Sequence, residues 1–274
     1  MNPTLSIIIV SFNTRKLTLD AITSVYREGS KLTKQIIVVD NNSQDGSIQA
    51  LRKLGENDKE IVLIENKENL GFAKANNQAI KIAKGSYILL LNSDTEIIPG
   101  ALGKLVAFAD KTPDAGVIGA KLLNHDGSTQ PSCYNFPKLC LAINEYFLGK
   151  KGLTSKFAPH VKQAAEVDAV VGAAFLITPK AIRKVGLLDE RYFFYFEDLD
   201  YCRKVKKAGL KTYYLSEAKI YHYHGASGRR EGEEKQNTRL IASSKIYHGI
   251  VGYYLYTLVL WLGQKWQRLI NTQK

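Results

Sequence analysis

Carboxylates follow apolar or aromatic runs at three points in the sequence. They are Asp40 after 35–39, Asp94 after 87–91 and Asp198 after 193–196. Since open α/β sheets bind ligands at the carboxyl ends of their strands, Asp40 and Asp94 are candidates for a binding site, and Asp198 is a candidate at a helix N-terminus. Such groups accept hydrogen bonds, ligate metals or act as general bases. The alternative at each point is a polar cap for the helix that follows.

Glu197 and Asp198 are candidates for acid–base chemistry. They open a helical pattern that runs to residue 208, directly behind the aromatic run 193–196. The helix dipole favours an ionised carboxylate at this position, whereas aromatic surroundings disfavour it. A partly desolvated but ionised carboxylate is suited to take a proton from an attacking hydroxyl. The alternative is that the pair only caps the helix.

Two histidines are candidate metal ligands. His222 and His224 lie two residues apart in the strand pattern 212–223, so both project to one face of the strand. Together with Asp94 they would supply mixed nitrogen and oxygen ligands for Mg²⁺ or Mn²⁺. The same spacing also fits two partly buried histidines without a ligand.

The elements that must position these residues alternate between strands and helices in the first half of the chain. Strand patterns occupy 5–12, 35–40, 61–64 and 87–91, and helical patterns occupy 14–26, 47–54 and 69–83. This alternation predicts an α/β fold with a doubly wound, mostly parallel sheet and helices on both faces.

The second half is less regular. Strand patterns cover 117–123, 170–177 and 212–223, and a helical pattern covers 198–208. The connection between 123 and 170 contains three prolines and is expected to be functional or to carry helices of its own. The charged segment 225–238 predicts a mobile loop or lid.

The C-terminal part differs from the rest in composition. Residues 246–263 contain no Lys, Arg, Asp or Glu, and Trp261 and Trp266 lie in or near them. A membrane span needs about 20 apolar residues. Three interpretations therefore stay open: a helix at the membrane interface, a helix packed on the domain or on a dimer partner, and a true span. We expect one domain over 1–235 and an aromatic-rich helical segment, 236–274, that could associate with membrane.

The net charge and the cysteine count of the chain restrict its compartment and its partners. The chain of 274 residues carries a net charge of +12, which suits an anionic membrane leaflet or a phosphorylated substrate. Nucleic acid is not expected, since no recognised binding motif accompanies the charge. Three cysteines without zinc-site spacing suggest a reducing compartment, and no export signal is recognised. We expect a cytoplasmic protein that could be peripheral on the inner face of the cell membrane.

Seven motifs occur in an ordered set between residues 5 and 230. They are SIIIVSFN at 6–13, VVDNNSQDGS at 38–47, NLGFAKANN at 69–77, LLNSDT at 90–95, VVGAAFLI at 170–177, LLDERYFFYFEDLDYCRKVKKAG at 187–209 and HYHGAS at 222–227. As a set they resemble the inverting family 2 glycosyltransferases of the GT-A fold, near the bacterial rhamnosyltransferase-like members.

The resemblance implies a hexosyltransferase-type enzyme of cell-surface polysaccharide synthesis. Its donor would be a dTDP-, UDP- or GDP-linked sugar, with rhamnose as one candidate, and its acceptor a saccharide or a lipid-linked saccharide. A divalent metal, Mg²⁺ or Mn²⁺, would assist. The alternative is a non-catalytic, basic, membrane-associated module that binds nucleotide sugars, which leaves Asp94 and the 197–198 pair without a reason to converge.

The resemblance also implies roles for individual residues. Asp198 resembles the catalytic base, with Glu197 as its catalytic partner, and Gly172 and Ala173 border the acceptor. Asp94, with His222 or His224, resembles the metal site, and Asn92 replaces the first acid of the D-x-D motif. The predicted nucleotide-sugar contacts are Ser11, Asn13, Asp40, Asn42, Asp45, Gly71, Asn76, Asn92 and Asp94. Arg229 and Arg230 would close over the diphosphate.

Overall fold

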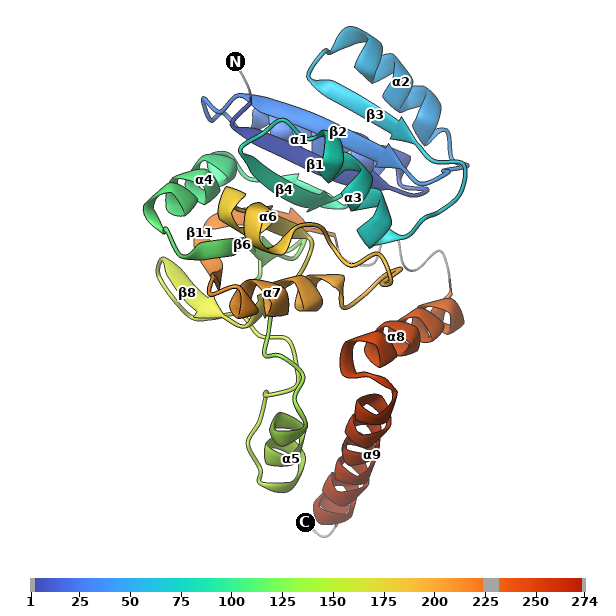
Figure 1. Cartoon of the computed structure of the whole chain (residues 1–274), viewed down its shortest axis with the longest axis vertical. Helices are drawn as coiled ribbons and strands as arrows, with labels where there is room; N and C mark the ends of the chain where they lie inside the picture. Colours follow the sequence, from blue (N-terminus) through green and yellow to red (C-terminus); the bar gives the residue numbers. More distant parts are fainter. Residues whose placement is uncertain (1–2, 224–231, 273–274) are drawn as a thin grey trace.

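The computed structural model describes residues 3–223 and 232–272 (Figure 1). Its strands are β1 (Leu5–Ser11), β2 (Lys34–Asp40), β3 (Ile61–Glu65), β4 (Tyr87–Asn92), β5 (Thr95–Ile97), β6 (Ala115–Leu123), β7 (Cys133–Tyr134), β8 (Ala164–Val167), β9 (Ala169–Val170), β10 (Ala174–Ile177) and β11 (Lys211–His222). Its helices are α1 (Arg15–Arg27), α2 (Ser47–Asn57), α3 (Phe72–Ile82), α4 (Ala101–Lys111), α5 (Leu139–Phe147), α6 (Pro179–Val185), α7 (Glu197–Lys207), α8 (Glu233–His248) and α9 (Ile250–Thr272).

One mixed sheet organises the domain. Its strand order is β3-β2-β1-β4-β10-β6-β11-β5, and β8 pairs with β11. Strands β1 to β4 are parallel to one another, whereas β10 runs antiparallel to both β4 and β6. The strands of the parallel half are near-continuous apolar runs because both of their faces are covered. The predicted α/β fold with a mostly parallel sheet is confirmed.

Two apolar cores cover the two faces of the sheet. Ile7 and Ile9 of β1 pack in the core that includes residues of α1, α2 and α4. Ile8, the residue between them, packs in the core that includes residues of α3, α6 and α7. Alternation along the strand thus sends successive side chains to opposite helix layers. The prediction of helices on both faces is confirmed.

The predicted strand over 170–177 is interrupted. Residues 169–170 form β9, which pairs with β7 in a small second sheet, and 174–177 form β10 in the main sheet. Between them, Val171 N–H donates to the Ser132 carbonyl (2.8 Å) and Gly172 N–H donates to Asp198 Oδ2 (3.0 Å). The apolar pattern was read correctly, but these non-local hydrogen bonds take the backbone out of the main sheet.

The C-terminal segment consists of two helices. Helices α8 and α9 meet at Gly249, whose φ is 72°. The prediction of a loop over 225–238 was wrong for residues 233–238, because they form the first part of α8. Arg229 and Arg230 lie outside the described residues. The expected domain boundary at 235/236 falls inside α8. Among the described helices, none combines the length and the apolar character that crossing a membrane requires.

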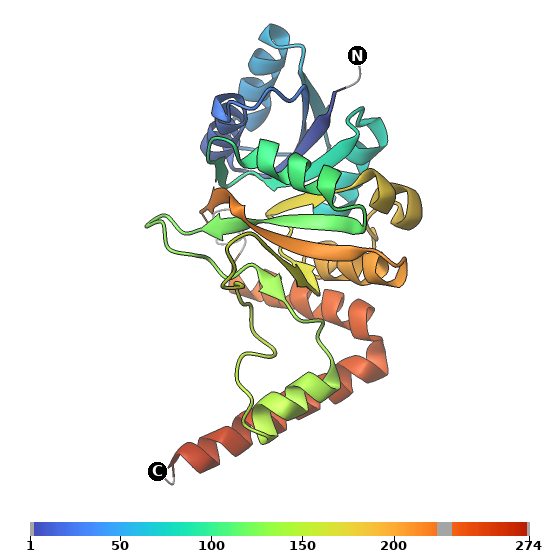
Figure 2. The same ribbon diagram turned by 90° about the vertical axis from the view of Figure 1, so that its left-hand side faces the viewer.

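Helix α5 packs along α9, away from the main sheet (Figure 2). The contact is close at one point, since a Cβ at Gly263 would lie 2.4 Å from Tyr146 Cβ. Helix α5 lies in the long proline-containing connection, so the expectation that this connection carries a helix is confirmed. No sequence pattern predicted α4, α6 or the short strands β5, β7 and β8.

Candidate active site

The loops after β1 and β2 are joined by hydrogen bonds at the carboxyl edge of the sheet. Asn13 N–H donates to Ser43 Oγ (2.9 Å), and Gln44 N–H donates to Asn13 Oδ1 (2.7 Å). Asn13 and Asn42 both have positive φ, 55° and 67°, a conformation that Asn tolerates better than most residues. Ser11 is fully buried, and its hydroxyl lies 3.0 Å from Thr18 Oγ1. These predicted nucleotide contacts therefore all shape the two loops.

Asp40 ends β2 with one of its carboxylate oxygens engaged and the other without a partner. Oδ1 accepts a hydrogen bond from Ser43 N–H (2.8 Å). Oδ2 is buried and has no hydrogen-bond partner among the described residues. Burial raises the pKa of Asp40, and the hydrogen bonds from Ser43 oppose that rise. A buried acceptor of this kind is costly unless a donor reaches it, so Asp40 suits an N–H or O–H of a bound ligand.

Asp45 caps two helices, although it was predicted to contact the nucleotide sugar. Its Oδ2 accepts a hydrogen bond from Arg15 N–H (2.8 Å) at the start of α1, and its Oδ1 accepts one from Ser47 N–H (3.1 Å) at the start of α2. Both oxygens thus bind backbone groups that the first turn of a helix leaves unpaired. The neighbouring Asn42 has its Oδ1 3.1 Å from Gln44 Nε2.

Gly71 allows α3 to approach the aromatic run. Its φ is 80°, and a Cβ there would lie 2.4 Å from the Phe193 carbonyl oxygen. Phe72 N–H donates to that same oxygen (2.7 Å). Asn41 Nδ2 donates to the Gly71 carbonyl (3.2 Å), which ties the end of β2 to the same point. The absence of a side chain at Gly71 thus lets the start of α3 contact the aromatic run, which a Cβ would push away.

The two amides of α3 are buried rather than exposed. Asn76 Nδ2 donates to the Phe72 carbonyl (2.9 Å) within the helix. Asn77 donates to the Leu188 carbonyl (2.9 Å) and accepts from Leu188 N–H (3.0 Å). Asn76, a predicted nucleotide-sugar contact, thus bonds within its own helix, and Asn77 fixes the segment that leads to the aromatic run.

Asp94 faces His222 at the end of β4. Pairing of β5 with β11 sets His222 opposite Thr95, and His222 Nε2 lies 3.4 Å from Asp94 Oδ1. Asn92 Nδ2 lies 3.4 Å from the same nitrogen. Both His222 and Asp94 are buried. His224 lies outside the described residues, within which no group of three or more His, Cys, Asp or Glu side chains is close enough to hold a metal.

Gln130 orients His222. Its Oε1 lies 2.7 Å from His222 Nδ1, and its Nε2 donates to the His222 carbonyl (3.2 Å). A neutral imidazole that donates through Nδ1 presents the lone pair of Nε2, which is how metal-ligating histidines are commonly held. Asp94 and His222 thus offer one oxygen and one nitrogen on one side. This set fits a divalent ion that also takes oxygens from a substrate phosphate. The sequence carried no signal for Gln130.

Asp198 is held by two backbone N–H groups at the start of α7. Gly172 N–H donates to Oδ2 (3.0 Å) and Leu199 N–H donates to Oδ1 (2.7 Å). The turn before it has positive φ at Tyr195 and Phe196, 72° and 69°. Loss of water raises the pKa of Asp198, while the two N–H bonds and the charge of Lys156 oppose the rise. The carboxylate is half-buried, so it stays accessible.

Glu197 differs from Asp198 in its environment. It is 6% exposed, and its Oε2 is buried without a partner among the described residues. Burial, and then the negative charge of Asp198, raise the pKa of Glu197 well above its ordinary value. The environments of the two carboxyl groups thus push their pKa values apart, a pattern that assigns different acid–base roles to the two groups. Burial favours the neutral form of Glu197 more strongly than that of Asp198, whose two oxygens accept backbone N–H bonds.

Tyr134 and Lys156 lie near Asp198, and sequence reasoning missed both. The Lys156 ammonium lies 5.4 Å from the centre of the Tyr134 ring. Burial raises the pKa of Tyr134, and so do the charges of Asp198 and Glu197. Loss of water lowers the pKa of Lys156, and the charge of Asp198 opposes that change. Both residues come from the long connection, where nothing in the local pattern marks them.

Hydrogen bonds link the ends of β2 and β4 to the start of α7. Asn92 N–H donates to the Ala173 carbonyl (2.9 Å), and the adjacent Gly172 binds Asp198. Ala173 is fully buried, so its side chain does not line the site, whereas Gly172 contacts Asp198 directly. These bonds tie the end of β4 to the start of α7, where Asp198 lies in the first turn of a helix and not at the end of a strand.

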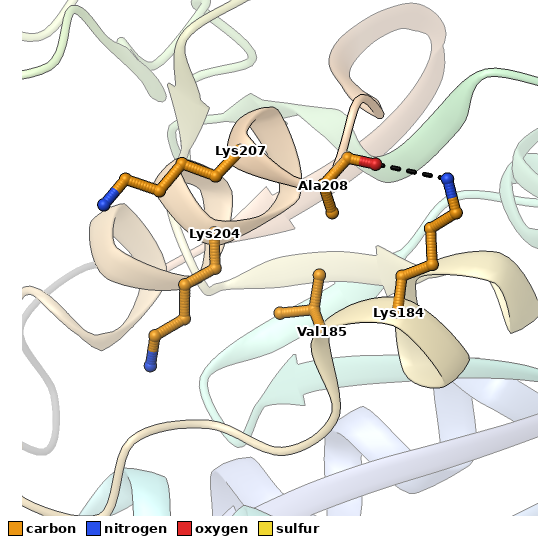
Figure 3. A pocket seen from close by; sticks show the side chains of 5 residues that line it. All are labelled: Lys184, Val185, Lys204, Lys207 and Ala208. Carbon is orange, nitrogen blue, oxygen red and sulfur yellow. Dashed lines mark hydrogen bonds between the residues drawn. The ribbon is translucent and has the colours of Figure 1, made fainter.

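A basic hollow lies at the other end of α7 (Figure 3). It has a volume of about 310 Å³ and is lined by Lys184, Val185, Lys204, Lys207 and Ala208. Lys184 Nζ donates to the Ala208 carbonyl (3.2 Å). Cations at a helix C-terminus complement the helix dipole. This hollow is thus explained by the end of α7 and is separate from the site around Asp198.

Comparisons with known proteins agree with this geometry. The family model "Glycosyl transferase family 2" matches residues 6–151, more than half of the chain. The chain is 28% identical over 213 residues to an N-acetylglucosaminyl-diphospho-decaprenol L-rhamnosyltransferase of Mycobacterium tuberculosis, covering 72% of this chain and 68% of the relative.

Solved structures of low sequence identity share the fold. GalNAc-T7 with UDP, GalNAc and Mn²⁺ has a TM-score of 0.63 at 16% identity over 81% of this chain, which spans only 43% of GalNAc-T7. The mannosyltransferase PcManGT of Pyrobaculum calidifontis, in complex with GDP-Man and Mn²⁺, has a TM-score of 0.63 at 16% identity. The match covers 100% of this chain and 76% of the PcManGT chain. The GT-A fold and the expected family are thereby confirmed, and the chain belongs to glycosyl transferase family 2.

Proposed function

We propose that this glycosyltransferase moves a sugar from a nucleoside-diphosphate donor to a hydroxyl of a lipid-linked saccharide, with inversion, in cell-surface polysaccharide synthesis. The observation that carries the proposal is the setting of Asp198. Two backbone N–H groups fix both of its oxygens, and it is half-buried beside Glu197, whose pKa burial raises well above its ordinary value. An ionised carboxylate with a raised pKa is suited to general-base chemistry near neutral pH.

In the proposed reaction Asp198 takes the proton of the acceptor hydroxyl as that oxygen attacks the anomeric carbon. Each Asp198 oxygen accepts one N–H bond and keeps a further lone pair for this proton. Gly172 sits beside the carboxylate without a side chain, which leaves room for the acceptor. The diphosphate departs without protonation, so one base suffices, whereas a glycosidase needs an acid as well. Glu197 acts through Asp198, as a positioning residue.

The donor would lie between the loops after β1, β2 and β4. Asp40 Oδ2 would accept a hydrogen bond from the base or the ribose. Asp94 and His222 would hold Mg²⁺ or Mn²⁺, and Asn92 lies beside them. When bound, such an ion neutralises charge on the departing diphosphate. Two structures of the same fold contain Mn²⁺, which supports a divalent metal.

The acceptor and the sugar are supported by the mycobacterial relative. Its name specifies L-rhamnose as the transferred sugar and a diphosphate-linked lipid saccharide as the acceptor. We therefore take rhamnose and a lipid-diphosphate-linked saccharide as the first candidates for this chain, and dTDP-, UDP- and GDP-linked sugars as the donors to compare. The family assignment does not favour the alternative of a non-catalytic binding module.

The surface of α5 and α9 supports contact with the inner leaflet of the membrane. Side chains of α9 that are at least half exposed include Ile250, Val251, Tyr254, Trp261 and Leu269. Water does not favour so much exposed apolar surface on a monomer. Exposed cations of the same region are Lys138, Lys150, Lys151, Lys265 and Arg268. Apolar and aromatic residues beside cations are the composition of a helix that lies in an anionic interface.

Replacing the base tests the reaction. We expect Asp198→Asn to lower kcat roughly 10²- to 10⁴-fold, the usual contribution of a general base, with little change in donor affinity. Asp20→Asn, at an exposed aspartate of α1, is the matched control. Release of nucleoside diphosphate and NMR of the product's anomeric centre are the measurements. Near wild-type transfer by Asp198→Asn, or a product that retains the donor configuration, would contradict the mechanism.

Vesicle flotation tests the membrane contact. We expect the full chain to bind vesicles that contain anionic lipid more strongly than neutral ones. Val251→Glu should weaken binding, because the new charge lies on the apolar surface, whereas Gln264→Glu adds the same charge at an exposed polar position of α9 and serves as the control. Equal binding by both variants, or a change only in oligomeric state, would argue against the membrane assignment.

A further inference from the structure

Residues 133–157, here called the arm, leave the active site and return to it. Cys133 N–H donates to the Phe157 carbonyl (2.9 Å), and Phe157 N–H donates to the Cys133 carbonyl (3.0 Å), so the two ends of the arm are paired. Cys133 also pairs with Val170, two residues before Gly172. The root of the arm is therefore fixed beside the backbone N–H that holds Asp198.

The root of the arm places a cation at this site. Lys156 lies next to the paired Phe157, with its ammonium 5.4 Å from the Tyr134 ring centre. It forms no salt bridge with any residue that the structure describes. The charge of Asp198 acts on Lys156 and opposes the lowering of its pKa by loss of water. Lys156 is exposed, and the described residues leave it without a salt bridge while its charge acts on the proposed base Asp198, so it is suited to an anionic group on the substrate that this base serves.

The far end of the arm is apolar. Helix α5 exposes Leu139, Ile143 and Phe147, each 40% exposed, and Leu148 follows at 67%. The figures place α5 beside α9 and away from the sheet (Figure 2). From the active site outward, the order is thus the carboxylate of Asp198, the cation of Lys156 at the root of the arm, and the apolar surface of α5. A lipid-diphosphate-linked sugar has the same order of sugar, anion and hydrocarbon.

We propose that Lys156 binds the diphosphate of a lipid-diphosphate-linked acceptor, so that the acceptor sugar reaches Asp198 while its lipid extends toward α5. This inference rests on the proposed function and names the part of the acceptor that the arm recognises. In the proposed function the donor diphosphate would instead bind at Asp94 and His222, which do not belong to the arm. Two separate sites for the two diphosphates keep the anomeric carbon between the leaving group and the attacking hydroxyl.

Binding of a lipid diphosphate without a sugar tests the role of Lys156. Farnesyl diphosphate is titrated into the full chain in the presence of UDP and Mn²⁺, and Kd is measured by calorimetry. Lys156→Gln should weaken binding roughly 10-fold or more, the usual loss for a charged hydrogen bond, and Lys156→Arg should retain most of it. Lys162→Gln removes an exposed lysine of the same connection and should leave Kd unchanged. Equal affinity of the wild type and Lys156→Gln would overturn the inference.

Transfer kinetics separate this role from tuning of the base. With N-acetylglucosaminyl diphosphate on a farnesyl chain as acceptor, Lys156→Gln should raise KM and leave the pH dependence of kcat unchanged. A shifted pH profile with unchanged KM would assign Lys156 to Asp198 instead. Donor affinity, measured with dTDP-, UDP- and GDP-sugars, is expected to be the same in every variant. If no nucleotide sugar binds the wild type, the proposed function itself fails, independently of Lys156.

Discussion

Replacing Gly71 by Ala should damage both stability and catalysis. Gly71 has φ 80° and ψ 179°, a region that only glycine occupies readily. An added Cβ would lie 2.4 Å from the Phe193 carbonyl oxygen and 2.9 Å from its ring. The backbone strain costs about 1–3 kcal/mol, and the overpacking costs a further ~1–3 kcal/mol. We therefore expect a loss of about 2–6 kcal/mol in the free energy of unfolding, the sum of the two costs.

Gly127 provides the matched control. Its φ is also 80°, but a Cβ there would meet no atom within 4 Å. Gly127→Ala should therefore show only the cost of a left-handed backbone, about 1–2 kcal/mol. Urea unfolding of the two variants, followed by circular dichroism, gives both free energies. The excess loss in Gly71→Ala reports the contact with Phe193 together with the extended ψ of Gly71, 179°.

The same variant should slow transfer. Phe193 lies four residues before Glu197, in the run that leads into α7, and a displacement of about 1 Å at a catalytic group can cost roughly 10²-fold in rate. We expect kcat of Gly71→Ala to fall while that of Gly127→Ala stays near the wild type. Equal destabilisation by the two substitutions, or full activity of a folded Gly71→Ala protein, would refute the reasoning.

Three further predictions concern titration and the metal. Because burial raises the pKa of Asp198, kcat/KM should rise with pH to a plateau, with a midpoint above that of an ordinary aspartic acid; a flat acid limb would contradict this. The folded-state pKa of Glu197 is raised, so its stabilising contribution is complete below the unfolded value of about 4.3 and is lost as pH rises through the folded value. Glu197→Gln should therefore gain unfolding free energy relative to the wild type as pH increases from 4 to 8, and a pH-independent difference in urea unfolding would count against it. Gln130→Leu frees the imidazole of His222, and Mn²⁺ affinity measured with bound nucleotide should fall about 10- to 100-fold; unchanged affinity would remove His222 from the metal site.

Sequence alone could not separate a cap from a ligand site at Asp45 or Asp40. Both residues follow the second strand within one polar stretch, and both have the side chain of a cap. In the structure, backbone N–H groups of α1 and α2 take both oxygens of Asp45, whereas one oxygen of Asp40 remains without a partner among the described residues. The difference comes from which helix termini pack against each residue, and spacing does not encode that.

The sequence determined the parallel half of the sheet, the positions of Asp40 and Asp94 at or just after strand ends, and the start of the helix that carries Asp198. Buried strands need continuous apolar runs, and those runs end where polar side chains can meet a ligand. Tertiary structure alone brought Gln130 to His222, 92 residues away, and Lys156 to the neighbourhood of Asp198. Such contacts depend on non-local pairing of irregular segments, and that pairing leaves no periodic trace in the chain. The proposed catalytic base, Asp198, could thus be singled out from the sequence, whereas its neighbours are identified only when the connection folds back on the sheet.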